Sequence, residues 1–379
     1  MTEVSNSTKA PTGQAYERRT FILGLAGLAA GASVFSSFGG QLVHAAKSRK
    51  LGVALVGLGG YSRDWLAPAL TETQHCELRG IVTGSPEKIP LWQKRYNIAD
   101  KNVYSYDTMH KLADNPDIDV AYIVTPTGTH MQYSLFAANA GKHVWCEKPM
   151  AMSVAECQKI IDTCNKNKVS LSIGYRLQHE PNTIRFGNYA QQNMFGKVKA
   201  IETRAGYAGQ PHPEDYWRMK KAMGGGAMYD MGVYPVNGAR YLTKLEPIAI
   251  TARHEKKYPN EFKEVDQTTV FTLEFPNGVQ ANCATSVVES YNKARIDCEK
   301  GWYELDPMSR YRGVKGQDSR GGNFPAISGR QQTLQMDSDA LAIINRQPVR
   351  VPGIDGLRDI RIVEAAFESA KNNSKRVLI

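Results

Sequence analysis

The feature that most constrains the fold of this chain is a glycine-rich turn that follows the apolar run 53–56, with a helical pattern beginning at Arg63. Glycines at such a turn permit a sharp exit from a strand and let the backbone approach a pyrophosphate, which the free N–H groups of the next helix can bind. Because the turn closes the first strand of a strand–helix–strand unit, it predicts a dinucleotide-binding loop in which a serine replaces the usual third glycine. The predicted loop residues are Gly57, Gly59, Gly60, Tyr61 and Ser62.

Apolar runs and helical patterns alternate from residue 51 to residue 174. The apolar runs are 51–57, 78–83, 120–125, 143–146 and 170–174. The helical patterns are 63–71, 88–96, 106–115, 129–140 and 154–167. This alternation predicts a doubly wound parallel sheet, so we expect an α/β Rossmann domain over residues 46–175.

The pattern changes after about residue 178. The segments with period-two alternation are 198–205, 247–254, 267–275, 279–286 and 295–297, and they follow a helical pattern at 182–192. Period-two alternation, with a Pro-Asn-Gly turn at 276–278, predicts a large, mostly antiparallel sheet with one buried face. We therefore expect a second α+β domain over residues 176–355, and a C-terminal helix within 356–379 that packs back on the Rossmann domain.

The end of the second predicted strand indicates which dinucleotide the domain prefers. An acid at this place usually binds the ribose 2′-hydroxyl of NAD. This chain instead has the hydroxyls of Thr83 and Ser85 and the cation of Lys88, which suit a 2′-phosphate. These residues favour NADP, and Glu87 leaves NAD as the alternative cofactor. The alternative role for Lys88 is that it only lies on a solvated helix face and binds no phosphate.

Two further clusters lie at the carboxyl ends of predicted parallel strands, where an open α/β sheet places its ligand crevice. They supply the cofactor-site candidates Thr125, Pro126, His130, Glu147 and Lys148. The Lys148 cation can hydrogen-bond a substrate oxygen and stabilise developing negative charge. His130 has no partner ligands at a suitable spacing, so we expect it to position the loop or cap a helix, and we expect no metal site.

Several motifs occur together in one order along the chain. They are the glycine turn, Glu-Lys-Pro at 147–149, Gly-Tyr-Arg at 174–176, Trp-Arg at 217–218 and the run 224–234. In this combination the chain resembles the glucose-fructose oxidoreductase, inositol dehydrogenase and MocA family from about residue 51 to its end, and most closely the glucose-fructose oxidoreductase branch. The resemblance implies a Rossmann domain joined to an open antiparallel sheet, and activity on sugars, polyols and their keto forms.

The resemblance also assigns roles to side chains. Asp230 and Tyr234, four residues apart on one helix face, would point at the cofactor crevice with Lys148. Many family members have His at the position of Tyr234, whereas the glucose-fructose oxidoreductase branch has Tyr. Tyr234 is the candidate acid/base, because a nearby Lys148 cation would lower its pKa from the usual value of about 10. The candidate sugar contacts are Tyr175, Arg176, His179, Tyr216, Arg218 and Asp230, with a domain-interface role as the alternative for the first five.

The N-terminal residues 1–45 are predicted to be a cleaved twin-arginine-type signal. Arg18-Arg19 precede a Gly/Ala-rich apolar run at 21–38, and Val43-His44-Ala45 suits a signal peptidase. The run is shorter and less apolar than a membrane anchor of about 20 residues. We therefore expect export by the twin-arginine machinery to the periplasm. The net charge is +10, but the lysines and arginines are interspersed with acidic residues along the chain, so nucleic acid is not an expected partner.

The resemblance and the predicted export together imply a periplasmic oxidoreductase with tightly bound NADP. Since the periplasm should hold no useful pool of free cofactor, the cofactor must be regenerated in place, by oxidation of an aldose to its lactone and reduction of a second sugar. The alternatives are a dehydrogenase or reductase of a single sugar and a non-catalytic sugar-binding protein. As in the family, we expect a homo-oligomer, a dimer or tetramer, formed through the exposed face of the second sheet, which would otherwise leave apolar surface in water.

Overall fold

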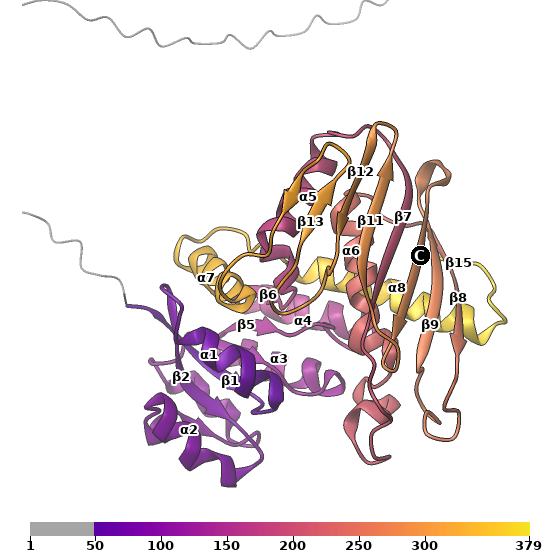
Figure 1. Ribbon diagram of the computed structural model, residues 1–379. Coiled ribbons are helices and arrows are strands. Elements are labelled where there is room, and N and C mark those ends of the chain that lie inside the picture. The colour runs from indigo at the N-terminus through magenta and orange to yellow at the C-terminus, as the bar shows by residue number, and fades with distance from the viewer. Residues whose placement is uncertain (1–48) are drawn as a thin grey trace, which may run out of the picture. The chain divides into compact units, whose positions relative to one another are not determined.

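The computed structural model describes residues 49–379, and the predicted signal segment lies outside these described residues. Two sheets with their helices make up the described chain (Figure 1). Across residues 49–379, no helix combines the length and the apolar character needed to cross a membrane.

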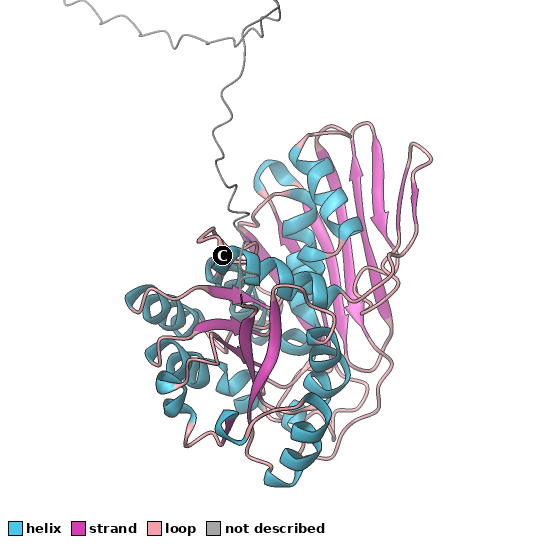
Figure 2. Cartoon of the chain, turned by 90° about the vertical axis from the view of Figure 1, so that its left-hand side faces the viewer, coloured by secondary structure: helices cyan, strands magenta, loops and turns pink. Residues whose placement is uncertain are grey.

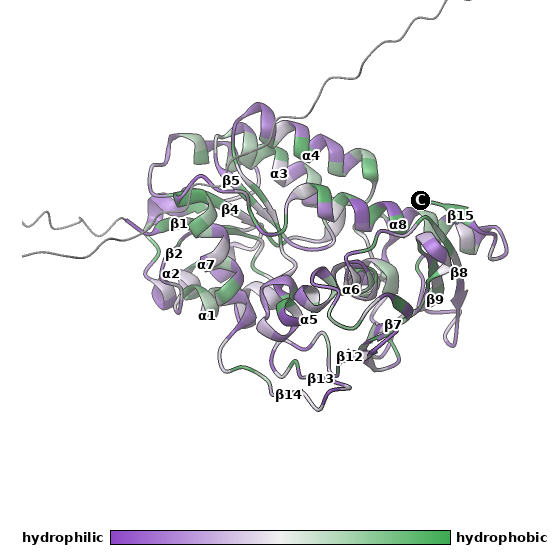
Figure 3. Cartoon of the chain, turned by 90° about the horizontal axis from the view of Figure 1, so that it is seen from above, coloured by the Kyte–Doolittle hydropathy of each residue, from purple (hydrophilic) through white to green (hydrophobic). Residues whose placement is uncertain are grey.

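The first sheet is the predicted parallel one. Its strands are β1 (Leu51–Val56), β2 (Cys76–Val82), β3 (Val103–Tyr104), β4 (Val120–Ile123), β5 (His143–Cys146) and β6 (Leu171–Ile173). They are ordered β3-β2-β1-β4-β5-β6, and every neighbouring pair is parallel. The central strands β1 and β4 are apolar and buried on both faces (Figure 3), as expected where helices cover both sides of a sheet. The strand order reverses between β1 and β4, where such sheets bind ligands.

The helices of this domain mostly lie where the sequence predicted them. They are η1 (Ser62–Leu66), α1 (Ala67–Leu70), α2 (Ile89–Tyr96), α3 (His130–Asn139) and α4 (Val154–Lys166). The predicted helix over 106–115 is wrong, because only the 3-10 segment η4 (Met109–Asp114) forms there. Ser105 and Thr108 bind each other's backbone N–H groups, and Asn115, which precedes a proline, is extended.

The second sheet has nine strands in the order β14-β13-β12-β11-β7-β10-β9-β8-β15, and only the β10–β7 pair among them is parallel. The strands are β7 (Val198–Gly206), β8 (Ala249–Glu255), β9 (Thr268–Glu274), β10 (Gln280–Ser286), β11 (Tyr291–Cys298), β12 (Gly301–Leu305), β13 (Gly316–Asp318), β14 (Asn323–Phe324) and β15 (Val377–Leu378). Helices α5 (Pro181–Gln191) and α6 (Val233–Thr243) lie on one side of this sheet (Figure 2). The predicted fold class, a Rossmann domain plus a mostly antiparallel α+β domain, is confirmed.

Two C-terminal helices join the two sheets. Helix α8 (Gly353–Lys371) contacts α4 and β6 of the Rossmann domain as well as β8 of the second sheet. Helix α7 (Gln331–Ile344) contacts α1 and β2, although it falls in the chain segment assigned to the second domain. The chain therefore returns to the Rossmann sheet before residue 355.

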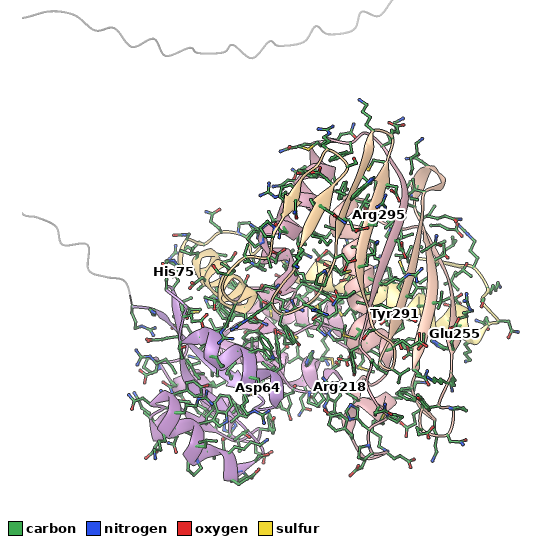
Figure 4. The ribbon with its side chains drawn as sticks, viewed as in Figure 1. Asp64, His75, Arg218, Glu255, Tyr291 and Arg295 are labelled. Atoms are coloured by element: carbon green, nitrogen blue, oxygen red, sulfur yellow. The ribbon has the colours of Figure 1, made fainter. Side chains whose placement is uncertain are left out.

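The open face of the second sheet is polar, which differs from the apolar surface expected there. Along β10, Ala281 and Cys283 are buried while the alternating Gln280 and Asn282 are exposed. Arginines occupy the same face of other strands, and Arg295 is labelled on β11 in Figure 4. A large share of the side chains on this face bear charge or amide groups. The need to bury apolar surface therefore gives no reason for this face to bind a partner.

Candidate active site

The glycine turn after β1 has the geometry that the sequence predicted. Gly57 has a φ of +101°, and a Cβ there would meet the Val124 carbonyl oxygen at 3.0 Å, so only glycine fits without strain. Its N–H donates to the Val82 carbonyl oxygen at 2.9 Å. The Ser62 hydroxyl donates to the Gly57 carbonyl oxygen at 2.6 Å, so the serine in place of the third glycine closes the turn.

The next two glycines leave the outer side of the turn open. Gly59 and Gly60 are exposed, and a Cβ built on Gly59 would meet nothing within 4 Å. The loop backbone can therefore be approached closely by a pyrophosphate, with the N-terminal N–H groups of η1 and α1 behind it. The residues present fit a bound dinucleotide at this edge of the sheet.

The end of β2 brings a cation back to the glycine turn. The Ser85 N–H donates to the Thr83 hydroxyl oxygen at 3.0 Å, which shapes the loop. The Lys88 ammonium reaches the Leu58 carbonyl oxygen at 3.5 Å, and in the described chain it has no carboxylate partner within ion-pair distance. A free cation beside the turn suits the additional phosphate of NADP.

His130 ties together the loops that follow β4 and β5. Its Nδ1 lies 2.9 Å from the Pro149 carbonyl oxygen and its Nε2 lies 2.8 Å from the Thr125 carbonyl oxygen. The Thr129 hydroxyl donates to the Thr125 hydroxyl at 2.8 Å, and Pro126 precedes this turn. Burial lowers the pKa of the His130 imidazole, although both ring nitrogens contact carbonyl oxygens, and the ring holds the two loops together at the rim of the crevice.

Glu147 is a buried carboxyl next to the candidate lysine. The Tyr122 hydroxyl donates to its Oε1 at 2.6 Å, and the Lys148 N–H donates to its Oε2 at 3.3 Å. A side chain at Gly174 would strike this carboxyl, which explains the glycine of the Gly-Tyr-Arg motif. Burial raises the pKa of Glu147 to about 7, so a substantial part of it is protonated at neutral pH.

Asp230 and Tyr234 stand on one continuous helical segment, η9 (Met228–Gly232) followed by α6. The segment begins against Asp266, whose carboxylate accepts the Met228 N–H at 2.9 Å and whose carbonyl accepts the Ala227 N–H at 2.9 Å. The preceding glycines take positive φ or pack against backbone at this entry, which explains the triple glycine. Because Asp266 holds the start of this helical segment, it also determines where Asp230 and Tyr234 lie.

The structure brings Lys148, Asp230 and Tyr234 together. The Lys148 ammonium donates to the main-chain carbonyl oxygen of Asp230 at 2.8 Å and lies 4.6 Å from the centre of the Tyr234 ring. Asp230 thus holds the lysine through its backbone carbonyl and not through its carboxylate. The three predicted catalytic residues form one cluster between the Rossmann sheet and the second domain.

The Asp230 carboxylate is instead engaged by two second-domain side chains. The Tyr207 hydroxyl and the Arg218 Nε each lie 3.1 Å from its Oδ2, and Arg218 also donates to the Tyr216 hydroxyl at 2.7 Å. Burial raises the pKa of Asp230, but the cations of Arg218 and Lys148 outweigh it and hold that pKa below its usual value. Asp230 and Arg218 also line a pocket with Gln210, and Figure 4 shows Arg218 between the two domains.

Three predicted sugar contacts lie elsewhere than expected. Tyr175 is 1% exposed and points to the interior, where burial first and then Asp359 raise the pKa of its hydroxyl. His179 is also buried, and burial lowers the pKa of its imidazole to about 3. Arg176 reaches Tyr234 but is only 2% exposed, so it lies under the tyrosine and not on a sugar-facing wall. Arg176 and His179 belong to the 3-10 turn η6 (Arg176–His179), every residue of which is buried, and Tyr175 is the residue that begins this turn.

The sequence interpretation missed residues that complete the site. Tyr207 follows the predicted strand 198–205 and could have been suspected as a strand-end residue. No sequence pattern points to Tyr311, because it lies in a loop of the second domain. Its ring stacks on Tyr61 with the ring centroids 5.5 Å apart. Gln331, at the start of α7, accepts a hydrogen bond from Arg176.

A dinucleotide-binding turn after β1, together with the Lys148–Tyr234 pair formed by the end of β5 and α6, defines the class of nicotinamide-dependent oxidoreductases. The family profile described as "Oxidoreductase family, NAD-binding Rossmann fold" matches residues 51–175, and the profile of the GFO/IDH/MocA C-terminal domain matches residues 188–304. The chain belongs to the GFO/IDH/MocA oxidoreductase family, as its motifs predicted.

Individual relatives agree with this assignment. The crystal structure of aldose-aldose oxidoreductase from Caulobacter crescentus, complexed with glycerol, is 35% identical, with a TM-score of 0.82 over 87% of this chain and 100% of that one. D-xylose 1-dehydrogenase [NADP(+)] from Haloarcula marismortui is 26% identical over 85% of this chain and 91% of its own length. Scyllo-inositol dehydrogenase from Lactobacillus casei with bound NAD(H), at 20% identity and a TM-score of 0.72, shares the fold.

Proposed function

We propose that this protein is a periplasmic sugar oxidoreductase that uses tightly bound NADP to oxidise an aldose to its lactone and to reduce a second sugar. The observation that carries the proposal is the placement of Lys148 against the Tyr234 ring and the Asp230 carbonyl, after β5 of the same parallel sheet whose strand β1 leads into the glycine turn. Similarity to an aldose-aldose oxidoreductase over nearly the whole folded chain supports the substrate class.

The side chains can move a proton and hold a sugar while the cofactor carries the hydride. When held by the glycine turn and Lys88, NADP would supply hydride transfer between the carbon of one sugar and the carbonyl of a second. The Tyr234 phenolate takes the proton of the reacting sugar hydroxyl, and the resulting hydroxyl gives that proton to the carbonyl oxygen of the second sugar in the other half of the cycle. Lys148 polarises the same sugar oxygen, and Asp230 with Arg218 and Tyr207 orients the sugar ring from the second domain.

Two observations support NADP over NAD. Lys88 lies free beside the glycine turn, and the loop after β2 carries hydroxyls where NAD-binding chains usually carry an acid. The xylose dehydrogenase among the relatives uses NADP, whereas the inositol dehydrogenase structure contains NAD(H). NADP therefore stays the proposed cofactor and NAD the alternative.

The proposal that the cofactor stays bound rests on the export signal predicted for residues 1–45. A protein that folds before it crosses the membrane can carry a cofactor with it, and in the periplasm it would have no free pool from which to replace it. A paired oxidation and reduction then regenerates the cofactor in place. Cell fractionation of the full-length protein, with and without an Arg18-Arg19→Lys-Lys change, tests the export step on which this depends.

Self-association through the polar open face of the second sheet is part of the same proposal. Its side chains include ion pairs such as Lys293 Nζ to Glu304 Oε2 at 2.7 Å, so contacts there would be polar and sensitive to salt. Sedimentation of the mature chain at low and high ionic strength distinguishes a dimer, a tetramer and a monomer.

Two alternatives differ in a measurable way. A single-sugar dehydrogenase would need free cofactor for each turnover, and a sugar-binding protein would need no Tyr234 hydroxyl. The test is the near-ultraviolet absorbance of extensively desalted mature protein, before and after glucose and then after fructose. A reduced-nicotinamide band that rises with glucose and falls with fructose supports the proposal. A band that appears only after free NADP or NAD is added favours the single-sugar dehydrogenase.

A further inference from the structure

Arg176 is a buried cation without a counter-anion. It is 2% exposed, and within residues 49–379 no carboxylate lies at ion-pair distance from its guanidinium. Its NH2 donates to the Ser309 carbonyl oxygen at 2.6 Å and its NH1 to the Arg310 carbonyl oxygen at 3.3 Å and to the Gln331 side chain. These neutral oxygens accept from NH1 and NH2, while the buried Nε has no partner among the described residues, so the positive charge is left uncompensated, which is costly in a buried site.

Two tyrosine rings pack against this guanidinium. Its carbon lies 4.4 Å from the centre of the Tyr311 ring and 5.5 Å from that of Tyr234, which provides cation–π attraction on two sides. Its NH2 also lies 3.4 Å from the Tyr234 hydroxyl oxygen. The one contact of Arg176 that can become an anion at a reacting group is therefore this phenolic oxygen.

We propose that Arg176 is a positioning residue that stabilises the deprotonated hydroxyl of Tyr234 during turnover. The proposal rests on the proposed function, in which Tyr234 exchanges the sugar proton. Lys148 acts on the face of the ring, while Arg176 acts on the oxygen from the side away from the sugar. A fixed buried cation at the atom where charge develops favours the charged form without any rearrangement.

Other titratable groups around the pair do not cancel this effect. They are Tyr61 before η1, Glu147 and Lys148 after β5, Glu180 before α5, Asp230 on η9 and Tyr311 after β12. The Glu180 carboxyl accepts from the Thr183 N–H and hydroxyl, and burial raises its pKa. Glu147 is hydrogen-bonded to Tyr122, and burial raises its pKa to about 7, so it carries only part of a charge at neutral pH. The charge of Asp230 is compensated by Arg218 at 3.1 Å. The Arg176 cation stays available to Tyr234.

The sharpest test is Gln331→Glu, which leaves Arg176 in place and supplies the missing carboxylate at the position of the Gln331 amide oxygen. The new anion should compensate the guanidinium and raise the pH at which Tyr234 deprotonates. We expect the rate of aldose oxidation by the bound cofactor to fall at least tenfold near neutral pH and to recover at higher pH, a shift of one unit or more. Gln335→Glu, also buried on α7 but bonded to Tyr122 instead, is the matched control.

A second measurement needs neither cofactor nor sugar. Tyrosinate absorbance of the cofactor-free protein, taken as the difference from the Tyr234→Phe variant, reports the titration of this one hydroxyl. Its midpoint should rise in Gln331→Glu and in Arg176→Met, and Arg176→Lys should restore part of the wild-type value. Superimposable titrations of wild type and Gln331→Glu, in protein with unchanged thermal unfolding, overturn the proposal.

The same variants distinguish a failure of the Arg176 proposal from a failure of the proposed function. If Tyr234→Phe oxidises the aldose at the wild-type rate, the acid/base role of Tyr234 fails, whatever the Arg176 variants do. If Tyr234→Phe is inactive and Arg176→Met matches wild type in both rate and titration, only the role of Arg176 fails.

Discussion

The ammonium of Lys148 lies over the face of the Tyr234 ring, 4.6 Å from its centre, and not beside the phenolic oxygen. The Asp230 carbonyl holds it there at 2.8 Å. A cation above an aromatic face contributes about 0.5 to 2 kcal/mol, and this position leaves its other N–H donors free for a sugar oxygen. Lysine and tyrosine can therefore contact the same sugar hydroxyl from adjacent positions.

Replacement of Tyr234 by Phe tests the acid/base role. The ring stays under Lys148 while the proton-exchanging hydroxyl is lost, so we expect the rate of reduction of the bound cofactor by an aldose to fall by about 10² to 10⁴-fold. Cofactor content and thermal unfolding should match wild type. Single-turnover absorbance measurements give the rate, and wild-type speed in the variant would rule out Tyr234 as the proton carrier.

Lys148→Met should remove the cation while keeping the length and packing of the side chain. Without the ammonium, neither the sugar oxygen nor the Tyr234 ring faces a positive charge on this side, and we expect a loss of about 10² to 10³-fold in the same half-reaction. Lys142→Met is a useful comparison, because Lys142 is a more deeply buried lysine that follows α3 and donates to the Asn115 carbonyl oxygen. Equal losses in both variants would point to general destabilisation.

The sequence predicted those parts of the fold that local patterns specify. Long apolar runs and the glycine turn identified the Rossmann sheet, and period-two alternation identified strands β7 to β10. Strands β13, β14 and β15 have only two or three residues each, too few for any periodicity, and their pairing depends on partners far away in the chain. Helix α7 was missed because its apolar residues are mixed with buried polar ones such as Gln332 and Asp339.

In the candidate site, too, local patterns predict some residues correctly, whereas others depend on packing between distant parts of the chain. Lys148, Asp230 and Tyr234 meet as predicted, because a strand end and one helical segment place them, although Asp230 contacts Lys148 through its carbonyl oxygen and not through a side chain on the predicted helix face. Arg176 and His179 are only three residues apart, yet one reaches Tyr234 and the other is buried away from it. The direction of each side chain in a 3-10 turn depends on what packs around the turn, and this is not encoded in the local sequence.

Asp339→Asn should change how stability depends on pH. Both carboxylate oxygens of Asp339 are buried without a hydrogen-bond partner, and burial raises its pKa from 3.8 to about 7. The folded state then binds a proton that the unfolded state has lost, so the wild-type protein loses stability as pH rises from about 4 to 7. We expect the asparagine variant to gain on the order of 3 kcal/mol relative to wild type at pH 8, and little at pH 4.

Urea unfolding at several pH values measures this difference. Glu147 contributes in the same direction in both proteins, since burial also raises its pKa to about 7, so the comparison must be made between the two proteins and not along one pH series. A stability difference that is the same at pH 4 and pH 8 would mean that Asp339 does not ionise on unfolding as proposed.

Lys88→Glu should reverse the cofactor preference. The Lys88 ammonium stands beside the glycine turn at 3.5 Å from the Leu58 carbonyl oxygen, where a cation attracts and an anion repels a 2′-phosphate. We expect the affinity for NADP to fall at least tenfold relative to that for NAD, about 1.4 kcal/mol. Lys94→Glu is the matched control, because Lys94 is an exposed lysine in the last turn of α2. The identity and amount of cofactor released on denaturation give the result, and a variant that still carries NADP alone would show that residues other than Lys88 recognise the phosphate.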